Sequence, residues 1–195
     1  MQLPTLKGPR CTLRPLRESD AESMQRHADE PAVAYNLFDG FPQPYTLEMA
    51  QAWCGHQHLE PRYAHVLGVV VERDEVAGCI SVTPQTGLWA CSAVVGYWLG
   101  QAYWGRGVMS EALSLLTAWA WPALPQVTRL WMPIYARNLG SQGVARNAGY
   151  VLEGRMPLSI LKAGMAIDAV NFGCTRPGAA RASADGGYRL PTLGQ

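Results

Sequence analysis

Apolar and polar residues follow two different periodicities along this chain. A period of about 2 predicts strands, and a period of about 3.6 predicts helices. The middle of the chain has runs of β-branched and apolar residues separated by turn formers, which is typical of neighbouring strands. We expect strands there over residues 64–72, 79–83 and 89–99. A short strand is also expected over residues 11–16.

Capping residues indicate where two early helices begin. Ser19 and Glu22 have the S-x-x-E spacing of a capping box, which predicts a helix over residues 19–29. Thr46 is a candidate N-cap for the second helix, because an acidic residue follows in its first turn, where the helix dipole favours an anion. Between them, residues 31–45 are rich in aromatic residues and turn formers, so we expect a loop.

Apolar residues at helical spacing follow the third predicted central strand. One face of a helix predicted over residues 108–121 is apolar, with Met109, Ala112, Leu113, Leu116 and Ala120. We expect Pro122 to end this helix. A further strand is expected over residues 127–136, because alternate residues there are apolar.

The last part of the chain predicts a short helix, more strands and a tail. The helix is expected over residues 141–148, with Gly149 as its left-handed C′ residue, and the last strands over residues 151–173. Residues 176–195 are dominated by Gly, Ala, Pro and Ser, which indicates a flexible tail. Two helices followed by an antiparallel meander favour an α/β (α+β) domain over residues 1–175 rather than a doubly wound sheet.

Composition narrows the class of protein. At 195 residues the chain suits one domain, and its formal net charge of +1 gives no field that selects nucleic acid or an anionic membrane. The five cysteines have no C-x-x-C spacing, so neither a zinc site nor a disulfide framework is suggested. No apolar run approaches the ~20 residues needed to cross a bilayer, and we expect a soluble, cytoplasmic protein without a metal.

The strongest local signal is a strand, a glycine turn and an amphipathic helix in YWLGQAYWGRGVMSEA. Gly105 and Gly107 allow the backbone to approach a ligand closely, and the free N–H groups of the helix's first turn then face that ligand. Arg106 adds a permanent cation, so the unit suits a pyrophosphate. A tight turn that merely needs glycine is the alternative. The loop is neither a Walker A motif nor a dinucleotide fingerprint.

A second signal is the segment IYARNLGSQGVARNAGYVLEG. Asn138 leaves a predicted strand and Ser141 starts a short helix, so an amide and a hydroxyl lie at a strand exit and can serve an elongated polar ligand. The alternative is that Asn138 is only a turn former and Ser141 only an N-cap.

In this order, the two signals resemble the GNAT N-acetyltransferase superfamily, and most closely its RimJ/RimL-like branch of ribosomal-protein alanine acetyltransferases. The resemblance covers nearly the whole chain and also includes LRPLRESDAE, PYTLEMAQAW and AIDAVNF. It implies the GNAT acyl-CoA N-acyltransferase fold, a mixed, mostly antiparallel sheet with splayed central strands flanked by helices. It also implies that acetyl-CoA, as co-substrate, donates an acetyl group to an amine.

The resemblance implies a cofactor site between the strands that contain Leu99 and Ile134. Backbone groups of Trp98 and Leu99 would pair with the pantetheine arm, and a backbone amide near Leu99 would stabilise the oxyanion. Pro133 fits this arrangement, because a proline lacks the N–H that a paired central strand needs. The other implied cofactor-binding residues are Trp104 at the loop entrance, the amides of Gly105, Arg106, Gly107, Val108 and Met109, Asn138 on the pantetheine, and Ser141 near the sulfur.

Two residues depart from the family pattern. Met109 stands where the family usually has Gly or Ala, and it either narrows the phosphate site or points away. Ala145 stands where many members have a tyrosine acid, so Ser141 or water would protonate the leaving thiolate. That is tolerable, because a thiol of pKa about 8.5 leaves without much help.

A general base is harder to identify. The predicted strands over residues 89–99 and 127–136 contain no Asp, Glu or His. Asp168 and His65 are the candidates that the fold can bring inward, and each is alternatively a structural residue. A site without a base favours an acceptor of low pKa, such as a protein N-terminal α-amine.

The acceptor side is expected to be aromatic, with Tyr35, Phe41, Tyr45 and Tyr97 as substrate-binding residues. Two other functions stay open: acetylation of a small-molecule amine such as a metabolite or antibiotic, and a catalytically inert module that binds acyl-CoA. An RNA-binding domain lacks the basic balance and aromatic–basic interleaving it would need. A homodimer is possible.

Overall fold

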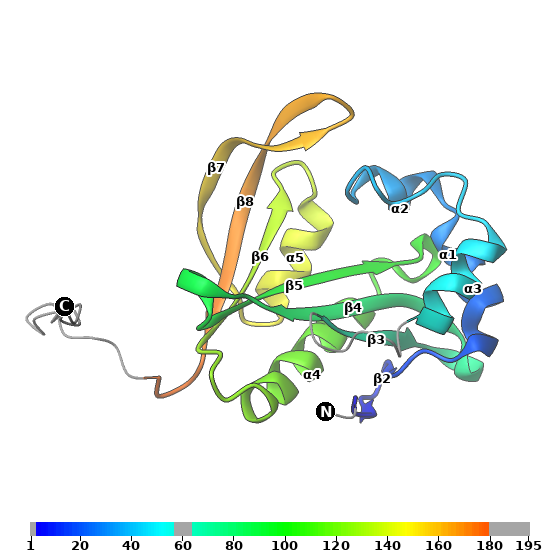
Figure 1. The fold of residues 1–195 in the computed structure, drawn as a ribbon, viewed down its shortest axis with the longest axis horizontal. Coiled ribbons are helices and arrows are strands. Elements are labelled where there is room, and N and C mark those ends of the chain that lie inside the picture. The colour runs from blue at the N-terminus through cyan, green and yellow to red at the C-terminus, as the bar shows by residue number, and fades with distance from the viewer. Residues whose placement is uncertain (1–2, 57–63, 180–195) are drawn as a thin grey trace, which may run out of the picture.

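The computed structural model describes residues 3–56 and 64–179, which form one sheet with helices on both faces (Figure 1). The strands are β1 (Leu6–Lys7), β2 (Thr12–Arg14), β3 (His65–Val70), β4 (Val76–Pro84), β5 (Ser92–Leu99), β6 (Arg129–Tyr135), β7 (Val151–Lys162) and β8 (Met165–Thr175). The helices are α1 (Ala21–Ala28), α2 (Pro31–Tyr35), α3 (Leu47–His56), α4 (Val108–Ala123) and α5 (Leu139–Asn147).

The described strands form an eight-stranded sheet in the order β1-β2-β3-β4-β5-β6-β8-β7. Every neighbouring pair is antiparallel except β5 and β6, which run parallel. The prediction of a mixed, mostly antiparallel sheet flanked by helices is therefore confirmed.

The two central strands separate after a short paired region. Residues Ser92–Val94 of β5 pair with Arg129–Trp131 of β6, yet β5 continues to Leu99 and β6 to Tyr135. Figure 1 shows the two strands diverging, with β5 running toward α1 and β6 toward the loop before α5. We call the gap between them the V. The expectation of splayed central strands is confirmed.

Each face of the sheet has its own hydrophobic core. The core under α4 and α5 includes Leu67, Val95, Leu113 and Met132. The core on the opposite face, under α1 and α3, includes Met24 and Cys54 together with Val76. Since side chains alternate along a strand, consecutive residues of β5 face opposite helices, and Tyr97 contacts the first core whereas Trp98 contacts the second.

The predicted central strands correspond to β3, β4 and β5, and the predicted strand over residues 11–16 to β2. β5 begins later than expected, because Gly87–Trp89 forms a 3₁₀ turn. Thr46 is confirmed as an N-cap, since its Oγ1 accepts a hydrogen bond from the Met49 N–H at 3.3 Å. Gly149 is confirmed as the residue that ends α5, with φ of 83°.

The predicted capping box at Ser19 is wrong. α1 begins at Ala21, after a 3₁₀ turn over Glu18–Asp20. The buried Asp20 carboxylate determines this geometry: it accepts from the Arg17 N–H at 2.7 Å and pairs with the Arg14 guanidinium at 2.7 and 2.8 Å. The Asp20 carboxylate, held by its ion pair with Arg14, therefore caps the chain at Arg17 in place of the predicted cap at Ser19.

Two smaller boundary predictions are also wrong. α4 does not stop before Pro122 but continues to Ala123, which is possible because the proline lies in the last turn of the helix. α5 begins at Leu139, and its N-cap is Asn138 rather than Ser141: the Asn138 Oδ1 accepts from the Ser141 N–H at 3.0 Å. An asparagine is as good an N-cap as a serine and lies earlier in the chain.

The predicted tail begins with a residue that contacts the domain. Arg176 donates hydrogen bonds to the carbonyls of Leu124 and Val127, both at 2.7 Å, and its guanidinium lies 5.4 Å from the centre of the Trp121 ring. Residues 180–195 of the predicted tail lie outside the described residues. Within the two described ranges, no helix is long and apolar enough to cross a membrane.

Candidate active site

Backbone hydrogen bonds show which way the peptide groups of β5 point. The Gly100 N–H donates to the Ala77 carbonyl at 2.8 Å, and the Ser92 carbonyl accepts from the Gln85 N–H at 2.9 Å. Both bonds join even-numbered residues of the β5 region to β4. Since peptide groups alternate in direction along a strand, the other even-numbered residues also turn their N–H and C=O groups toward β4.

The odd-numbered residues of β5 accordingly face β6. The Cys91 carbonyl, on that side, accepts from the Thr128 N–H at 2.8 Å. Beyond the paired region the same alternation directs the backbone groups of Tyr97 and Leu99 into the V, whereas those of Trp98 turn toward Cys79 of β4. Leu99 thus offers its N–H to a ligand in the V, but the Trp98 backbone does not.

Pro133 lies on the β6 side of the V. The Ala136 N–H donates to the Asp168 carbonyl at 2.9 Å, and the Thr128 carbonyl accepts from the Arg176 N–H at 2.8 Å, so even-numbered residues of β6 pair with β8. Pro133 is odd-numbered, and its imide nitrogen therefore faces the V. The missing N–H costs the β6–β8 ladder nothing, which agrees with the expectation that this proline lies where pairing lapses.

The glycine loop leads from β5 into the amino-terminal end of α4. Gly105 and Gly107 have φ of 73° and 75°, a left-handed conformation that glycine adopts without steric cost. Gly107 is the N-cap, so the free N–H groups of the first turn of the 16-residue helix α4 begin directly after it. Apart from Gly105 and its two chain neighbours, no heavy atom of the described residues lies within 4 Å of the position that a Gly105 Cβ would occupy, so the described part of the chain leaves this side of the loop open to a ligand.

Three predicted side chains of this loop have different surroundings. The Trp104 indole N–H donates to the Leu99 carbonyl at 2.6 Å, which fixes the loop against the end of β5. The Arg106 guanidinium is exposed and lies 5.4 Å from the centre of the Tyr103 ring. Met109 is buried in the core under α4, so its side chain points away from the loop and only its backbone remains available to phosphate.

The turn between β1 and β2 is held against the first turn of α4, an association that sequence reasoning missed. The Glu111 carboxylate accepts from the N–H groups of Arg10 and Cys11, at 2.6 and 3.1 Å. It also lies so close to Gly8 that a Cβ there would be 2.7 Å from it. No local pattern marks this contact, because its partners are about 100 residues apart.

Tyr97 and Ser141 meet across the V. The Tyr97 hydroxyl lies 2.7 Å from the Ser141 Oγ and donates to the Ser141 carbonyl at 3.1 Å. Burial raises the pKa of Tyr97 to about 12, so the phenol stays neutral at physiological pH. Tyr97 was predicted to bind the acceptor, but its side chain lies on the α4–α5 face beside Ser141.

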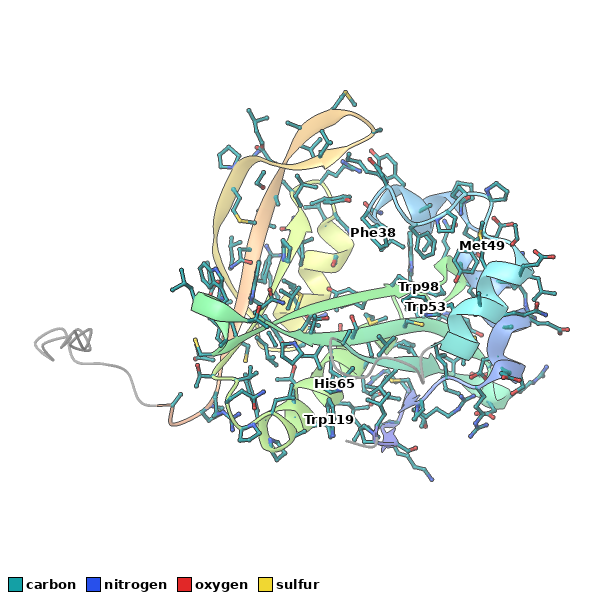
Figure 2. The ribbon with its side chains drawn as sticks, viewed as in Figure 1. Phe38, Met49, Trp53, His65, Trp98 and Trp119 are labelled. Carbon is teal, nitrogen blue, oxygen red and sulfur yellow. The ribbon has the colours of Figure 1, made fainter. Side chains whose placement is uncertain are left out.

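The remaining aromatic residues of the predicted acceptor side differ in exposure. Phe41 stacks on Tyr45 with ring centres 5.2 Å apart and meets Trp98 edge-on at 6.0 Å. Tyr45 is buried in the core under α1 and α3, and its pKa is raised to about 12 by burial. Trp98 is half-buried against the core under α1 and α3, whereas Phe38, labelled beside α2 in Figure 2, is exposed.

Residues 35–39, which begin with the last residue of α2, are bonded to the β6 side of the V. The Leu37 carbonyl accepts from the Tyr135 hydroxyl at 3.0 Å and from the Lys162 ammonium at 2.7 Å. The Arg137 guanidinium donates to the Tyr35 carbonyl at 2.9 Å and lies 4.3 Å from the centre of the Tyr35 ring. The segment thus connects the end of α2 to the end of β6 and to the tip of the β7–β8 hairpin (Figure 1).

The two candidate bases have different surroundings, and each makes contacts of its own. The Asp168 carboxylate accepts from the Leu158 N–H at 2.9 Å and pairs with Arg155 at 2.6 Å, and these bonds lower its pKa. His65 is buried edge-on against Trp119 of α4, as Figure 2 shows, and burial lowers its pKa. Within residues 3–56 and 64–179, its Nδ1 has no hydrogen-bond partner.

Comparison with known proteins identifies this arrangement. Residues 10–151 match the model of the acetyltransferase (GNAT) domain. The chain is 29% identical over 154 residues to the probable N-acetyltransferase YjcK of Bacillus subtilis, covering 76% of this chain and 84% of the relative.

Two solved structures have the same fold. RimJ of Mycobacterium smegmatis, in complex with a CoA disulfide, aligns with a TM-score of 0.78 at 20% identity over 90% of both chains. RimL, a ribosomal L7/L12 alpha-N-protein acetyltransferase in complex with coenzyme A, aligns with a TM-score of 0.75 at 21% identity over 88% of this chain and 98% of that one. The family match, the split central strands and the glycine loop agree: this chain belongs to the GNAT acetyltransferase family and is an acetyl-CoA-dependent acyltransferase.

Proposed function

We propose that this protein transfers the acetyl group of acetyl-CoA to an α-amine, with protein N-termini as the acceptor class, and that the reaction takes place in the V. The carrying observation is that β5 and β6 stop pairing after Val94 and Trp131, which leaves unpaired backbone groups facing each other above the glycine loop. An unpaired strand edge binds an extended ligand as an additional strand does. The pantetheine arm of CoA has amides suited to this pairing.

The described residues suggest how the cofactor is held. The Leu99 N–H and the Tyr97 backbone face the V, and the Leu99 carbonyl already accepts one hydrogen bond, from the Trp104 indole. The amides of Gly105, Arg106, Gly107, Val108 and Met109 are assigned to the pyrophosphate, where the dipole of α4 favours an anion. Asn138 has its Oδ1 engaged as an N-cap, so its amide Nδ2 is the group that we assign to the pantetheine.

Bound acetyl-CoA supplies an activated acyl thioester, and the protein supplies hydrogen-bond donors at both ends of the bond that breaks. We assign the Leu99 N–H to the oxygen that becomes negative as the amine attacks the carbonyl carbon. As the new C–N bond forms and the C–S bond breaks, the proton that the attacking nitrogen loses passes to the departing sulfur through the Ser141 hydroxyl, which donates its own proton to the sulfur and takes up the one from the nitrogen. Tyr97 holds the Ser141 Oγ in place. Many family members have a tyrosine where this chain has Ala145, which is buried. The phenol beside Ser141 in this chain is instead that of Tyr97 on β5.

Central strands that supply no basic or acidic side chain able to take a proton favour an amine that is already neutral. β5 and β6 contain no Asp, Glu or His, and Asp168 is engaged by Arg155. A lysine amine, of pKa about 10.4, costs roughly 4 kcal/mol to deprotonate near pH 7.4, whereas an α-amine near 7.8 costs well under 1 kcal/mol. The fold neighbours that act on protein N-termini support the same acceptor class.

Release of free thiol from acetyl-CoA tests the proposal. We would measure kcat/KM for N-terminal peptides beginning with Ala or Ser, the same peptides with a blocked α-amine and one internal lysine, polyamines and aminoglycosides. The expected result is turnover of the free N-terminal peptides at least about 100-fold above the blocked ones, from the difference in amine pKa. Preferred turnover of a small amine would assign a small-molecule acceptor instead. CoA binding without turnover of any amine would identify an inert acyl-CoA-binding domain.

A further inference from the structure

A second guanidinium lies beside the glycine loop, on the side opposite the core of α4. The side chain of Arg10 passes over Gly107: a Cβ built on Gly107 would lie 3.4 Å from the Arg10 Nε and 3.9 Å from its Cζ. Gly107 is the N-cap of α4, so this guanidinium adjoins the free N–H groups of the first turn.

Arg10 is presented rigidly rather than from a loose terminus. The Gly8 N–H donates to the Cys11 carbonyl at 2.9 Å and closes the β1–β2 turn, with Arg10 within it. The Glu111 carboxylate then binds the N–H groups of Arg10 and Cys11. The backbone under the guanidinium is therefore fixed to the same helix whose first turn faces the ligand.

The guanidinium itself is uncommitted. It is exposed, and no ion pair or hydrogen bond of its side chain occurs with any residue in the described ranges 3–56 and 64–179. Glu111 accepts from the Arg10 backbone and not from the guanidinium. A permanently charged fork held next to helix-terminal N–H groups suits a phosphate, which accepts two parallel hydrogen bonds from it.

We propose that Arg10 is a further cofactor-binding residue, whose guanidinium binds the pyrophosphate of acetyl-CoA together with the first-turn amides of α4. This inference rests on the assignment of the glycine loop to that pyrophosphate. The pyrophosphate is preferred over the 3′-phosphate of the ribose because the Arg10 side chain lies beside Gly107, the second left-handed residue and the N-cap directly before the first amides of α4. Arg106, on the same loop, supplies the other cation.

The test measures dissociation constants by calorimetry for the wild type and for Arg10→Gln, Arg10→Lys and Arg26→Gln. The ligands are CoA and dephospho-CoA, which lacks the 3′-phosphate but keeps the pyrophosphate. Arg26 is an exposed arginine of α1, 3.7 Å from Glu75 and on the other face of the sheet, so its variant controls for the loss of one charge. Melting temperatures without ligand report folding.

For Arg10→Gln we expect Kd to rise about 10-fold for CoA and by the same factor for dephospho-CoA, since one charge-assisted contact is lost. Arg10→Lys should lose about 3-fold, because it keeps the charge but not the fork, and Arg26→Gln should bind as the wild type does. Equal affinities of Arg10→Gln and the wild type would overturn the inference. A loss for CoA with none for dephospho-CoA would also overturn it and assign Arg10 to the 3′-phosphate.

The same data separate this inference from the proposed function. A wild-type protein that binds neither ligand would contradict the cofactor site as a whole. Wild-type binding that the Arg10 variants share would leave the cofactor site intact and remove Arg10 from it. As a second readout, turnover of acetyl-pantetheine, which has no pyrophosphate, should be equal in the wild type and Arg10→Gln.

Discussion

At the V, the two faces of the sheet differ in the kind of group that they offer to a ligand. We refer to them as the cofactor side, toward α4 and α5, and the acceptor side, toward α1 and α3. On the α4–α5 side the groups that we assign to the cofactor are mainly peptide N–H groups, positioned by two left-handed glycines and by the ends of α4 and α5. On the side of α1 and α3 the groups are side chains of the segment 35–45 and of Trp98. Backbone groups are the same in every sequence, whereas side chains are free to change with the acceptor.

The difference also concerns how each side is held together. The conformation of the glycine loop depends on local features, namely the two left-handed glycines and the N-cap of α4. Residues 35–39, by contrast, are held by bonds to Tyr135, Arg137 and Lys162, whose partners are 98 to 125 residues away in the chain. Long-range tethers of this kind can be altered without disturbing the cofactor side. We therefore expect variants of the two sides to have separable effects.

The largest effect is expected for Gly107→Val. A β-branched residue at φ of 75° is strained, and its Cβ would approach the Arg10 side chain to 3.4 Å. Loss of two or more charge-assisted bonds to phosphate should raise the Kd for acetyl-CoA about 100-fold or more. Calorimetry measures this, and the melting temperature of the free protein controls for folding. Normal binding by a folded variant would show that the loop does not hold the pyrophosphate.

This side of the V is also the part of the site that the sequence predicts best. The left-handed glycines, the N-terminal end of α4 and the placement of Pro133 follow from rules about single residues, and the structure agrees with each. The family resemblance, however, implied that the backbone of Trp98 as well as that of Leu99 would face the cofactor. The direction of the Trp98 peptide groups depends on the register with Cys79, which no local pattern specifies.

Side-chain positions on both sides were predicted less well, for the same reason. Tyr97 lies near Ser141 because β5 and α5 converge, 44 residues apart in the chain. Tyr45 has an aromatic neighbour, as expected, but is buried, because Asp29 binds its N–H at 2.8 Å and turns the ring into the core. Arg14 and Asp20 replaced the predicted cap at Ser19 by an ion pair. Each of these outcomes depends on tertiary contacts.

The next largest effect is expected for Ser141→Ala. General acids contribute about 10²–10⁴-fold, but a thiolate of pKa about 8.5 needs less help, so kcat should fall about 10- to 100-fold. Tyr97→Phe should lower kcat about 2- to 10-fold, since it removes the two neutral contacts of the Tyr97 hydroxyl with Ser141. The Kd for acetyl-CoA should change little in either variant.

The double variant distinguishes positioning from an independent role. If Tyr97 acts by holding the Ser141 Oγ, adding Tyr97→Phe to Ser141→Ala should lower kcat no further. If kcat of the double variant falls by the product of the two single-variant factors, Tyr97 acts separately from Ser141.

A smaller and one-sided effect is expected for Lys162→Ala. This ammonium binds the Leu37 carbonyl at 2.7 Å and pairs with Asp39 at 3.0 Å, so its loss should loosen residues 35–39. We expect KM for a peptide acceptor to rise about 3- to 10-fold, as for the loss of one or two exposed contacts, with the Kd for acetyl-CoA unchanged. Lys7→Ala, on β1, is the matched control. An equal loss of acetyl-CoA affinity would show that the two sides are coupled.

The smallest effect on turnover is expected for Asp168→Asn, and it decides whether the acceptor side contains a base. Arg155 and the Leu158 N–H hold the Asp168 carboxylate and lower its pKa, so the group is fully ionised at neutral pH and is a weak proton acceptor. A depressed pKa contributes stability above the unfolded pKa of about 3.9, and that stability is lost as pH falls through the folded value. The variant should therefore lower the melting temperature at pH 7 and change kcat/KM less than about 2-fold, because no proton transfer is removed. The acidic limb of the kcat/KM profile should instead follow the pKa of the amine. It should shift to higher pH when an acceptor of higher pKa replaces one of lower pKa, in the wild type and in the variant alike. Measurement of kcat/KM against pH for two such peptides tests this, and a limb that stays at the same pH for both acceptors and disappears in Asp168→Asn would make Asp168 the base.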